Sequence, residues 1–177
     1  ARFQTVGVGS LRDEYDAFRT QNASWLDDFS LFMALKDRYG GRPWTEWDRP
    51  LRTYQPEAVA AARIELLGDT DRHAFRQFLF FRQWMSLRRL ANQRGIAIIG
   101  DIPIYVASDS ADVWANQRRF LLDTEGRSTF VAGVPPDYFS ATGQLWGNPL
   151  YDWNEQAAEG YVWWIERIRA TLEMVDI

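Results

Sequence analysis

The segment from Pro135 to Pro149 combines aromatic and polar side chains in a way that suits carbohydrate binding. Its aromatic residues are Tyr138, Phe139 and Trp146, and its polar candidates are Asp137, Gln144 and Asn148. A pyranose has a face rich in CH groups and a rim of hydroxyls, so it fits flat apolar rings beside carboxylate and amide groups. The alternative is a loop that packs its own aromatic rings. Because surface loops rarely carry three aromatics, we predict a sugar-binding loop.

Asp101 is a second candidate for chemistry. It follows the apolar run Ile96-Ala97-Ile98-Ile99-Gly100, which predicts a buried parallel strand. A carboxylate at the carboxyl end of such a strand is placed to bind a substrate hydroxyl or to orient a catalytic group. The alternative is an aspartate that caps the following turn.

Other reactive residue types have simpler structural explanations. Asp109 or Ser110 is expected to cap a short helix over residues 109–115, with Asp112 in its first turn. His73 is the only histidine, which disfavours a Ser-His-Asp triad and a multi-histidine metal site, and we expect it to lie at the surface or to bond to a partner. There is no cysteine, phosphate-binding glycine loop or His-Glu-x-x-His motif. We therefore expect neither a metal nor a cofactor.

Composition limits the class of protein further. The 177 residues are 46% apolar and 25% charged, which is typical of a globular chain. A net charge of −4 argues against a nucleic-acid or anionic-membrane surface. No apolar run approaches the ~18 residues that a membrane span needs. The first ten residues do not resemble a signal peptide, and with no cysteine present we expect a cytoplasmic protein.

Residues 1–94 are predicted to be mainly helical. Apolar spacing and end signals place helices over 11–21, from Ser24 to Gly40-Gly41, over 57–67 with Gly68 following, and from Thr70 or Asp71 to about Arg94. The last of these carries apolar residues on more than one face, so we expect it to be buried on several sides.

Residues 95–177 follow a different pattern. The strand at 96–99 leads to the short helix, a hairpin around Glu125-Gly126, a long loop over 133–151, an amphipathic helix over 155–173 and the start of another strand at 174–177. This order predicts a βα unit whose loop, at about fifty residues, far exceeds the usual two to six. In βα barrels such loops build the active site, and a whole barrel needs roughly 250 residues. We therefore predict an α/β fold that is part of a barrel, incomplete in this chain.

Seven longer motifs carry a family resemblance from about Ser24 onward. They are Trp25-Leu26-Asp27-Asp28-Phe29 running into Leu31-Phe32-Met33-Ala34-Leu35-Lys36, Gly40-Gly41-Arg42-Pro43-Trp44, Phe78-Leu79-Phe80-Phe81-Arg82-Gln83-Trp84, Gly100-Asp101-Ile102-Pro103-Ile104-Tyr105-Val106-Ala107, Asp109-Ser110-Ala111-Asp112-Val113-Trp114, Val131-Ala132-Gly133-Val134-Pro135-Pro136-Asp137-Tyr138-Phe139-Ser140 and Gly143-Gln144-Leu145-Trp146-Gly147-Asn148-Pro149-Leu150-Tyr151. Together they resemble the 4-α-glucanotransferases (amylomaltases or disproportionating enzymes) of glycoside hydrolase family 77.

The resemblance implies a (β/α)8 TIM barrel with mainly helical insertions. It implies transfer of α-1,4-glucan segments between malto-oligosaccharides, amylose or glycogen-type glucans by a retaining double displacement that needs no metal. Asp101 resembles the family's strand-end aspartate near the donor sugar. The loop residues that match its mobile substrate loop, which helps sugar acceptors compete with water, are Tyr138, Phe139, Gln144, Trp146 and Asn148.

The resemblance places the catalytic carboxylates outside this chain. The family's nucleophile lies in an Arg-x-Asp-His motif, on the strand that begins near Asp176-Ile177, and the acid/base follows later. We therefore expect this chain alone to be inactive. One alternative is a non-catalytic α-glucan-binding module, which a stop codon directly after Ile177 would favour. A dinucleotide-dependent oxidoreductase that uses the turn at Gly100 is disfavoured because the further glycines are missing.

Overall fold

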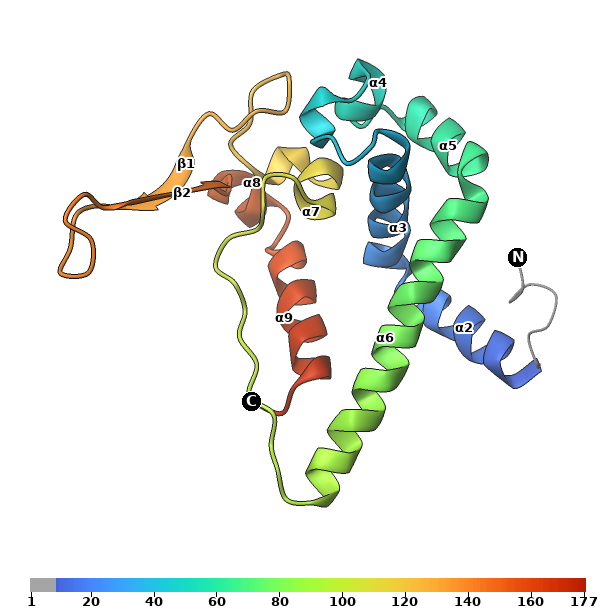
Figure 1. The fold of residues 1–177 in the computed structure, drawn as a ribbon. Helices are drawn as coiled ribbons and strands as arrows, with labels where there is room; N and C mark the ends of the chain where they lie inside the picture. Colours follow the sequence, from blue (N-terminus) through green and yellow to red (C-terminus); the bar gives the residue numbers. More distant parts are fainter. Residues whose placement is uncertain (1–8) are drawn as a thin grey trace.

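The computed structural model describes residues 9–177, and these residues are mostly helical with one small sheet (Figure 1). The helical elements are α2 (Gly9–Gln21), α3 (Ala23–Arg38), η1 (Trp44–Glu46), α4 (Arg49–Arg52), α5 (Pro56–Glu65), α6 (Leu67–Gln93), α7 (Ala111–Ala115), η2 (Gln117–Arg119), α8 (Trp153–Ala158) and α9 (Val162–Met174). The strands β1 (Val131–Val134) and β2 (Gln144–Pro149) pair antiparallel. None of the helices in the described part combines the length and the apolar character needed to cross a membrane.

Most of the predicted helices are present, with shifted ends. Helix α3 follows Asn22, so Ser24 lies in its first turn and the prediction that Ser24 caps it is wrong. The chain leaves α3 through Gly40 and Gly41, which have φ of +62° and +82° and provide the predicted stop. Gly68 does not separate two helices, because α6 begins at Leu67 and only Leu66 lies between it and α5.

Helix α6 is buried only in its first half, which contradicts the expectation of burial on several sides along the helix. Its buried residues, His73, Ala74 and Phe78, all lie in its first half, where α2 and α3 pack against it. Farther along, Phe80 and Leu87 are 47% and 54% exposed. At about 1.5 Å per residue the helix is roughly 40 Å long and extends past the elements that cover its beginning (Figure 1).

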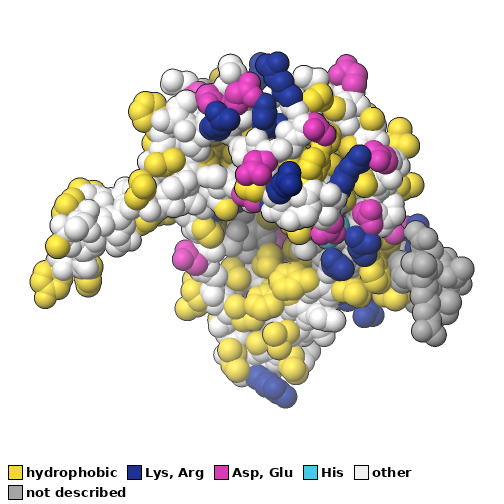
Figure 2. Space-filling view, turned by 45° about the horizontal axis from the view of Figure 1, so that its top comes forward, with side chains coloured by type: hydrophobic (Ala, Val, Ile, Leu, Met, Phe, Trp, Pro, Cys, Tyr) yellow, Lys and Arg dark blue, Asp and Glu magenta, His cyan; other side chains and the backbone are white. Residues whose placement is uncertain are grey.

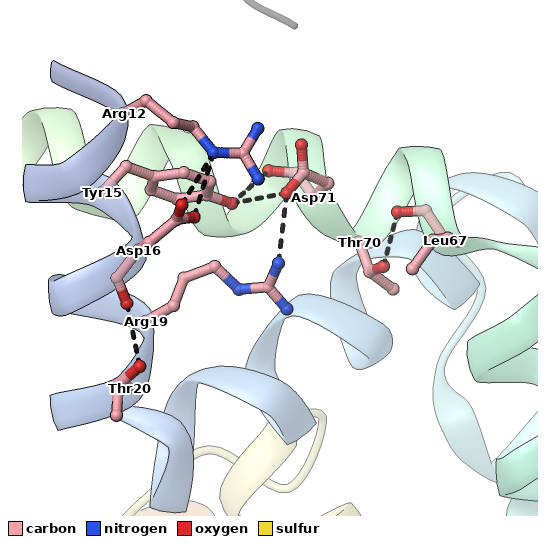
Figure 3. Close-up of polar contacts among 8 residues, drawn as sticks. All are labelled: Arg12, Tyr15, Asp16, Arg19, Thr20, Leu67, Thr70 and Asp71. Carbon is pink, nitrogen blue, oxygen red and sulfur yellow. Dashed lines mark hydrogen bonds and ion pairs between the residues drawn. The ribbon is translucent and has the colours of Figure 1, made fainter. Parts of the chain in front are cut away.

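Polar contacts fasten α6 to its two neighbours. The Tyr15 hydroxyl of α2 donates to the Asp71 carboxylate at 2.7 Å, and Arg19 donates to the same oxygen at 3.3 Å. Figure 3 shows both contacts. Burial and the Asp71 carboxylate raise the pKa of Tyr15. On the other side, His73 is buried and bonds to Asp37 of α3 at 2.9 Å. This bond lowers the pKa of Asp37 and makes His73 a partner-bonded residue, as expected.

The main core is built around three tryptophans. Trp44, Trp47 and Trp114 are almost fully buried, and the cluster also contains residues of α3, α5 and α9. Trp114 lies edge-on to Trp47 at 5.6 Å and donates its indole N–H to the Leu51 carbonyl at 2.8 Å. Helix α7, which carries Trp114, begins as predicted with the Ser110 hydroxyl accepting from the Val113 N–H. A second, smaller core joins α2, α3 and α6.

The turn at Glu125-Gly126 forms as predicted: Leu122 lies opposite Ser128 in an isolated bridge, and the Asp123 and Thr129 N–H groups donate across the turn to Arg127 and Leu121. Gly126 has φ of +78° and lies against the Trp44 indole, so a Cβ there would come within 2.4 Å of ring carbons. Glu125 forms an ion pair with Arg52. The turn is therefore held by the main core at Gly126 and by α4 at Glu125.

Residues 96–100 are extended but do not form the predicted buried strand. Ile96 and Ile99 are 56% and 74% exposed. The Gly100 N–H donates to the Ile177 carbonyl at 2.8 Å, and the Ile177 N–H donates to Ile98 at 3.3 Å. This is the bonding pattern of two parallel strands. Within the described residues, this segment pairs only with residues 176–177, so no longer β-ladder forms.

Asp176 is held strongly beside this pairing. Its carboxylate accepts from the Ile98 N–H at 2.8 Å, from the Asn92 amide at 2.8 Å and from Arg88 at 2.7 Å. The Ile98 N–H and then the two side chains lower its pKa from 3.8 to about 2.

This carboxylate predicts an acid-sensitive contribution to stability. Because the pKa of Asp176 is lower in the folded state, its ionised carboxylate stabilises the fold fully above pH ~5, and this stabilisation is lost as the pH falls through ~4 toward 2. In urea unfolding followed by circular dichroism from pH 2 to 7, the free-energy difference between the protein and Asp176→Asn should be constant above pH ~5 and shrink below pH ~4. Asp13→Asn, at an exposed position of α2, is the control. A difference that does not change with pH would contradict the assignment.

The C-terminal helical region is split, whereas one helix over 155–173 was predicted. Gly160 and Tyr161 both have positive φ, 68° and 57°, and they separate α8 from α9. Rotation at this break turns Trp163 into the core and leaves Ile165 and Ile168 48% and 42% exposed.

Candidate functional site

The predicted loop over 133–151 contains a β-hairpin rather than an irregular chain. Strands β1 and β2 and the turn between them, residues 131–149, form an arm that projects from the helical body (Figure 1). Figure 2 shows hydrophobic side chains at the far end of this arm. The arm carries all six of the candidate residues that were predicted between positions 137 and 148.

The tip of the arm is shaped by Asp137. One of its carboxylate oxygens accepts from the backbone N–H groups of Phe139 and Ser140, at 2.9 and 2.7 Å. Tyr138 and Phe139 are 97% and 90% exposed, and their rings meet edge-on at 5.5 Å. The tip therefore presents two aromatic side chains, while Asp137 organises the turn that holds them.

Strand β2 carries the other three candidates, from Gln144 beside the tip to Asn148 near the base of the arm. Trp146 is 47% exposed, donates its indole N–H to the Gln144 side-chain oxygen at 2.9 Å and contacts Tyr105 edge-on at 6.2 Å. The Asn148 amide donates to the Val106 carbonyl at 2.8 Å. Gln144 and Asn148 thus both bond within the protein, and Trp146 offers an exposed indole.

Asp101 is exposed and lies at the start of the chain segment that leads to the base of the arm. Within residues 9–177, no side-chain hydrogen bond or ion pair engages its carboxylate, and none links it to the arm residues. Its carboxylate is therefore available to a hydroxyl group from outside the chain.

Side chains, rather than a sheet, hold the segment that follows Asp101, residues 103–109. The carbonyls of Pro103, Ile104, Val106 and Ser108 accept from Arg167, Tyr151, Asn148 and Trp44 at 2.6, 2.8, 2.8 and 2.7 Å. The Asp109 carboxylate binds Lys36, the only lysine, at 2.6 Å. It also accepts the Trp44 N–H at 3.2 Å, so Asp109 bonds to Lys36 and Trp44, while Ser110 caps the helix. The segment is fixed to four separate elements of the fold.

Sequence reasoning missed the residues that support the site: Tyr105, Ser108, Tyr151 and Arg167. Tyr105 and Tyr151 stack with rings 6.0 Å apart, and burial raises the pKa of Tyr151. Arg167 lies over Trp163 and Trp164 at 5.3 and 5.2 Å and reaches the Tyr151 hydroxyl. Both tyrosines fall in motifs that could have drawn attention to them. Arg167 lies on a helix some sixty residues away, so no local signal marks it.

Other features of the described residues do not coincide with this site. A cavity of about 760 Å³ lies between α2 and α6, lined by residues that include Phe18, Phe81 and Met85, and none of the candidate residues contributes to it. No group of three or more histidine, aspartate or glutamate side chains in the described part is arranged to hold a metal ion.

Comparison with known proteins defines the class. The family model described as 4-alpha-glucanotransferase matches residues 1–177. The chain is 49% identical over 178 residues to the 4-alpha-glucanotransferase of Synechocystis, covering 100% of this chain and 35% of that protein. It is 53% identical over 166 residues to that of Thermus thermophilus, covering 94% and 33%.

A solved structure agrees with these relatives. The amylomaltase from Streptococcus agalactiae, in complex with acarbose, superposes with a TM-score of 0.86 at 40% identity, covering 92% of this chain and 33% of that one. The chain therefore belongs to the 4-alpha-glucanotransferase family. It spans about one third of the length of these relatives.

Proposed function

We propose that this chain is a substrate-binding segment of an enzyme that transfers α-1,4-glucan segments between malto-oligosaccharides. The observation that carries the proposal is the arm, which presents Tyr138, Phe139 and Trp146 to solvent. Exposed aromatic faces of this kind stack on pyranose rings. The related amylomaltase from Streptococcus agalactiae was solved with acarbose, which supports a carbohydrate ligand.

The residues of this chain would bind the sugar and exclude water. Trp146 would stack on a glucose unit near the reacting bond, and Tyr138 and Phe139 would close over it from the tip. Asp101 would accept a hydrogen bond from a hydroxyl of the donor sugar. Excluding water from the covalent glycosyl intermediate favours attack by a sugar hydroxyl, which gives transfer instead of hydrolysis.

The fold assignment that goes with this function is a partial (β/α)8 barrel. In it, residues 1–94 form a mainly helical insertion, and residues 95–177 form a barrel βα unit with its substrate-binding segment at 133–151. The parallel pairing of Gly100 with Ile177 supports the barrel unit. We place the nucleophile and the acid/base in the part of the relatives that this chain does not match, and the enzyme in the cytoplasm. Amylose and glycogen-type glucans are the expected polymeric partners.

Incubation with maltotriose tests the proposal. The full-length parent protein should produce glucose and longer oligomers, while the 177-residue chain alone should produce neither, because both catalytic carboxylates are absent. Products are separated by chromatography, with the Thermus thermophilus relative as the positive control.

Two outcomes would reject parts of the proposal. Glucose and longer oligomers from the isolated chain would show that the catalytic groups lie within it. A parent that binds maltoheptaose in calorimetry but forms no products would favour the alternative function, a non-catalytic α-glucan-binding module.

A further inference from the structure

Strand β2 contains a bulge at the place where it carries Trp146. Val131 lies opposite Pro149 and Gly133 lies opposite Leu145, so the three residues 146–148 face the single residue Ala132. Gly147, at the centre of the bulge, has φ of +77°. A bulge bends its strand and changes the direction of its side chains, and bulges are frequent beside active sites for that reason.

The bulge is fastened to the segment that follows Asp101. The Ser108 hydroxyl donates to the Gly147 carbonyl at 3.1 Å, and the Asn148 amide donates to the Val106 carbonyl at 2.8 Å. The Tyr105 ring meets the Trp146 indole from the same segment. Three contacts therefore join residues 105–108 to the bulge, one each at Trp146, Gly147 and Asn148.

Such fastening matters because a two-stranded hairpin is weakly stable by itself. An aromatic ring that stacks on a sugar must be held to within about half an ångström of its working position. The hairpin ladder alone does not define where the indole points, since the bulge interrupts the ladder at that residue. The contacts to 105–108 supply the missing constraint.

We propose that the Trp146–Asn148 bulge is a positioning device for the Trp146 indole, and that Gly147 and Asn148 act on the glucan only through it. The proposal rests on the proposed sugar-binding function of Trp146. It reassigns Asn148, predicted from sequence to bind the sugar directly, as a positioning residue whose amide holds the backbone of Val106.

The test uses the backbone preference of position 147 in the full-length parent. No atom lies within 4 Å of a Cβ built on Gly147, so a Cβ there meets no steric clash, and the backbone strain at φ of +77° is the expected effect of a substitution. Asparagine tolerates left-handed backbone and valine does not. Gly147→Val should weaken maltoheptaose binding about tenfold in calorimetry and raise the share of hydrolysis over transfer, while Gly147→Asn should stay within about twofold of the parent.

Gly40 offers a matched control for loss of stability. It also has positive φ and no atom within 4 Å of a Cβ placed on it, and it lies at the end of α3, away from the arm. Gly40→Val should lower the melting temperature by a similar amount without changing maltoheptaose affinity. Equal losses of affinity in both variants would overturn the proposal.

A double-mutant cycle separates positioning from direct contact. In a Trp146→Ala background, Gly147→Val and Asn148→Asp should have little further effect on maltoheptaose affinity, because the ring they position is gone. Full additivity would overturn the proposal, and so would a parent that does not bind maltoheptaose. A parent that binds with this coupling but does not transfer would reject the proposed transferase function and leave the positioning device supported.

Discussion

Trp146→Ala in the full-length parent is expected to lower kcat/KM for maltotriose disproportionation about thirtyfold. Removing a stacking aromatic at a well-packed site costs on the order of 2 kcal/mol of binding, and that loss reaches kcat/KM if the contact persists in the transition state. The indole is half exposed and supported by Gln144 and Tyr105, so it is held in place and still open to a ligand. Initial rates of glucose release measure the effect.

Trp146→Phe is the matched control. It retains a flat apolar face but loses the hydrogen bond to Gln144, so it should keep part of the activity. Melting temperatures of both variants separate stability from function. If Trp146→Ala shows normal kinetics and only a lower melting temperature, Trp146 serves packing and the sugar-binding interpretation of the arm is wrong.

Trp114→Ala should destabilise the protein by about 3–5 kcal/mol, which is typical for removing a large aromatic side chain from a core. Trp114 is completely buried, contacts Phe32, Trp47 and Tyr54, and bonds to the Leu51 carbonyl. Since domains unfold with about 5–15 kcal/mol, this one substitution removes a large share of the total. Urea unfolding followed by circular dichroism measures the loss.

Trp114→Phe distinguishes volume from hydrogen bonding. It keeps most of the ring contacts and removes one of two donors from the Leu51 carbonyl, which still accepts from the Tyr54 N–H at 3.2 Å. We therefore expect a loss of about 1–2 kcal/mol from the missing bond and the smaller ring. A loss below about 1 kcal/mol for Trp114→Ala would show that the main core does not depend on this residue. Phe80→Ala, at a half-exposed position of α6, should lose much less and serves as the surface comparison.

The parts of the fold that the sequence predicts well are those that local backbone chemistry determines. The end of α3 follows from Gly40 and Gly41, and the start of α7 follows from the Ser110 side chain. The same kind of signal failed at Gly68, because a glycine in the first turn of a long helix is tolerated when the rest of the helix packs. Whether a glycine ends a helix therefore depends on how the helix packs against its neighbours, and the residue types around the glycine do not reveal that packing.

The local structure of the candidate site is only partly predictable from the sequence. The hairpin was missed because Val131-Ala132-Gly133-Val134 has no polar alternation, and because Gly147 introduces a bulge where a regular strand would alternate. Asn148 was assigned to the sugar since its type suits that role, but its amide bonds to Val106. A sequence shows which donors are present and not where their acceptors lie.

The way in which residues 103–109 are held has a consequence for how this family can diverge. A backbone ladder survives most changes of side chain, whereas this segment keeps its path through side chains contributed by Trp44, Asn148, Tyr151 and Arg167. A single substitution on a distant helix, such as at Arg167 of α9, can therefore change the path of this segment. Because the segment also bonds to Gly147 and Asn148, the direction of the arm would change with it, and under the proposed function so would the preference for one acceptor over another. Mutational libraries that aim to retune specificity should include α9 as well as the arm itself.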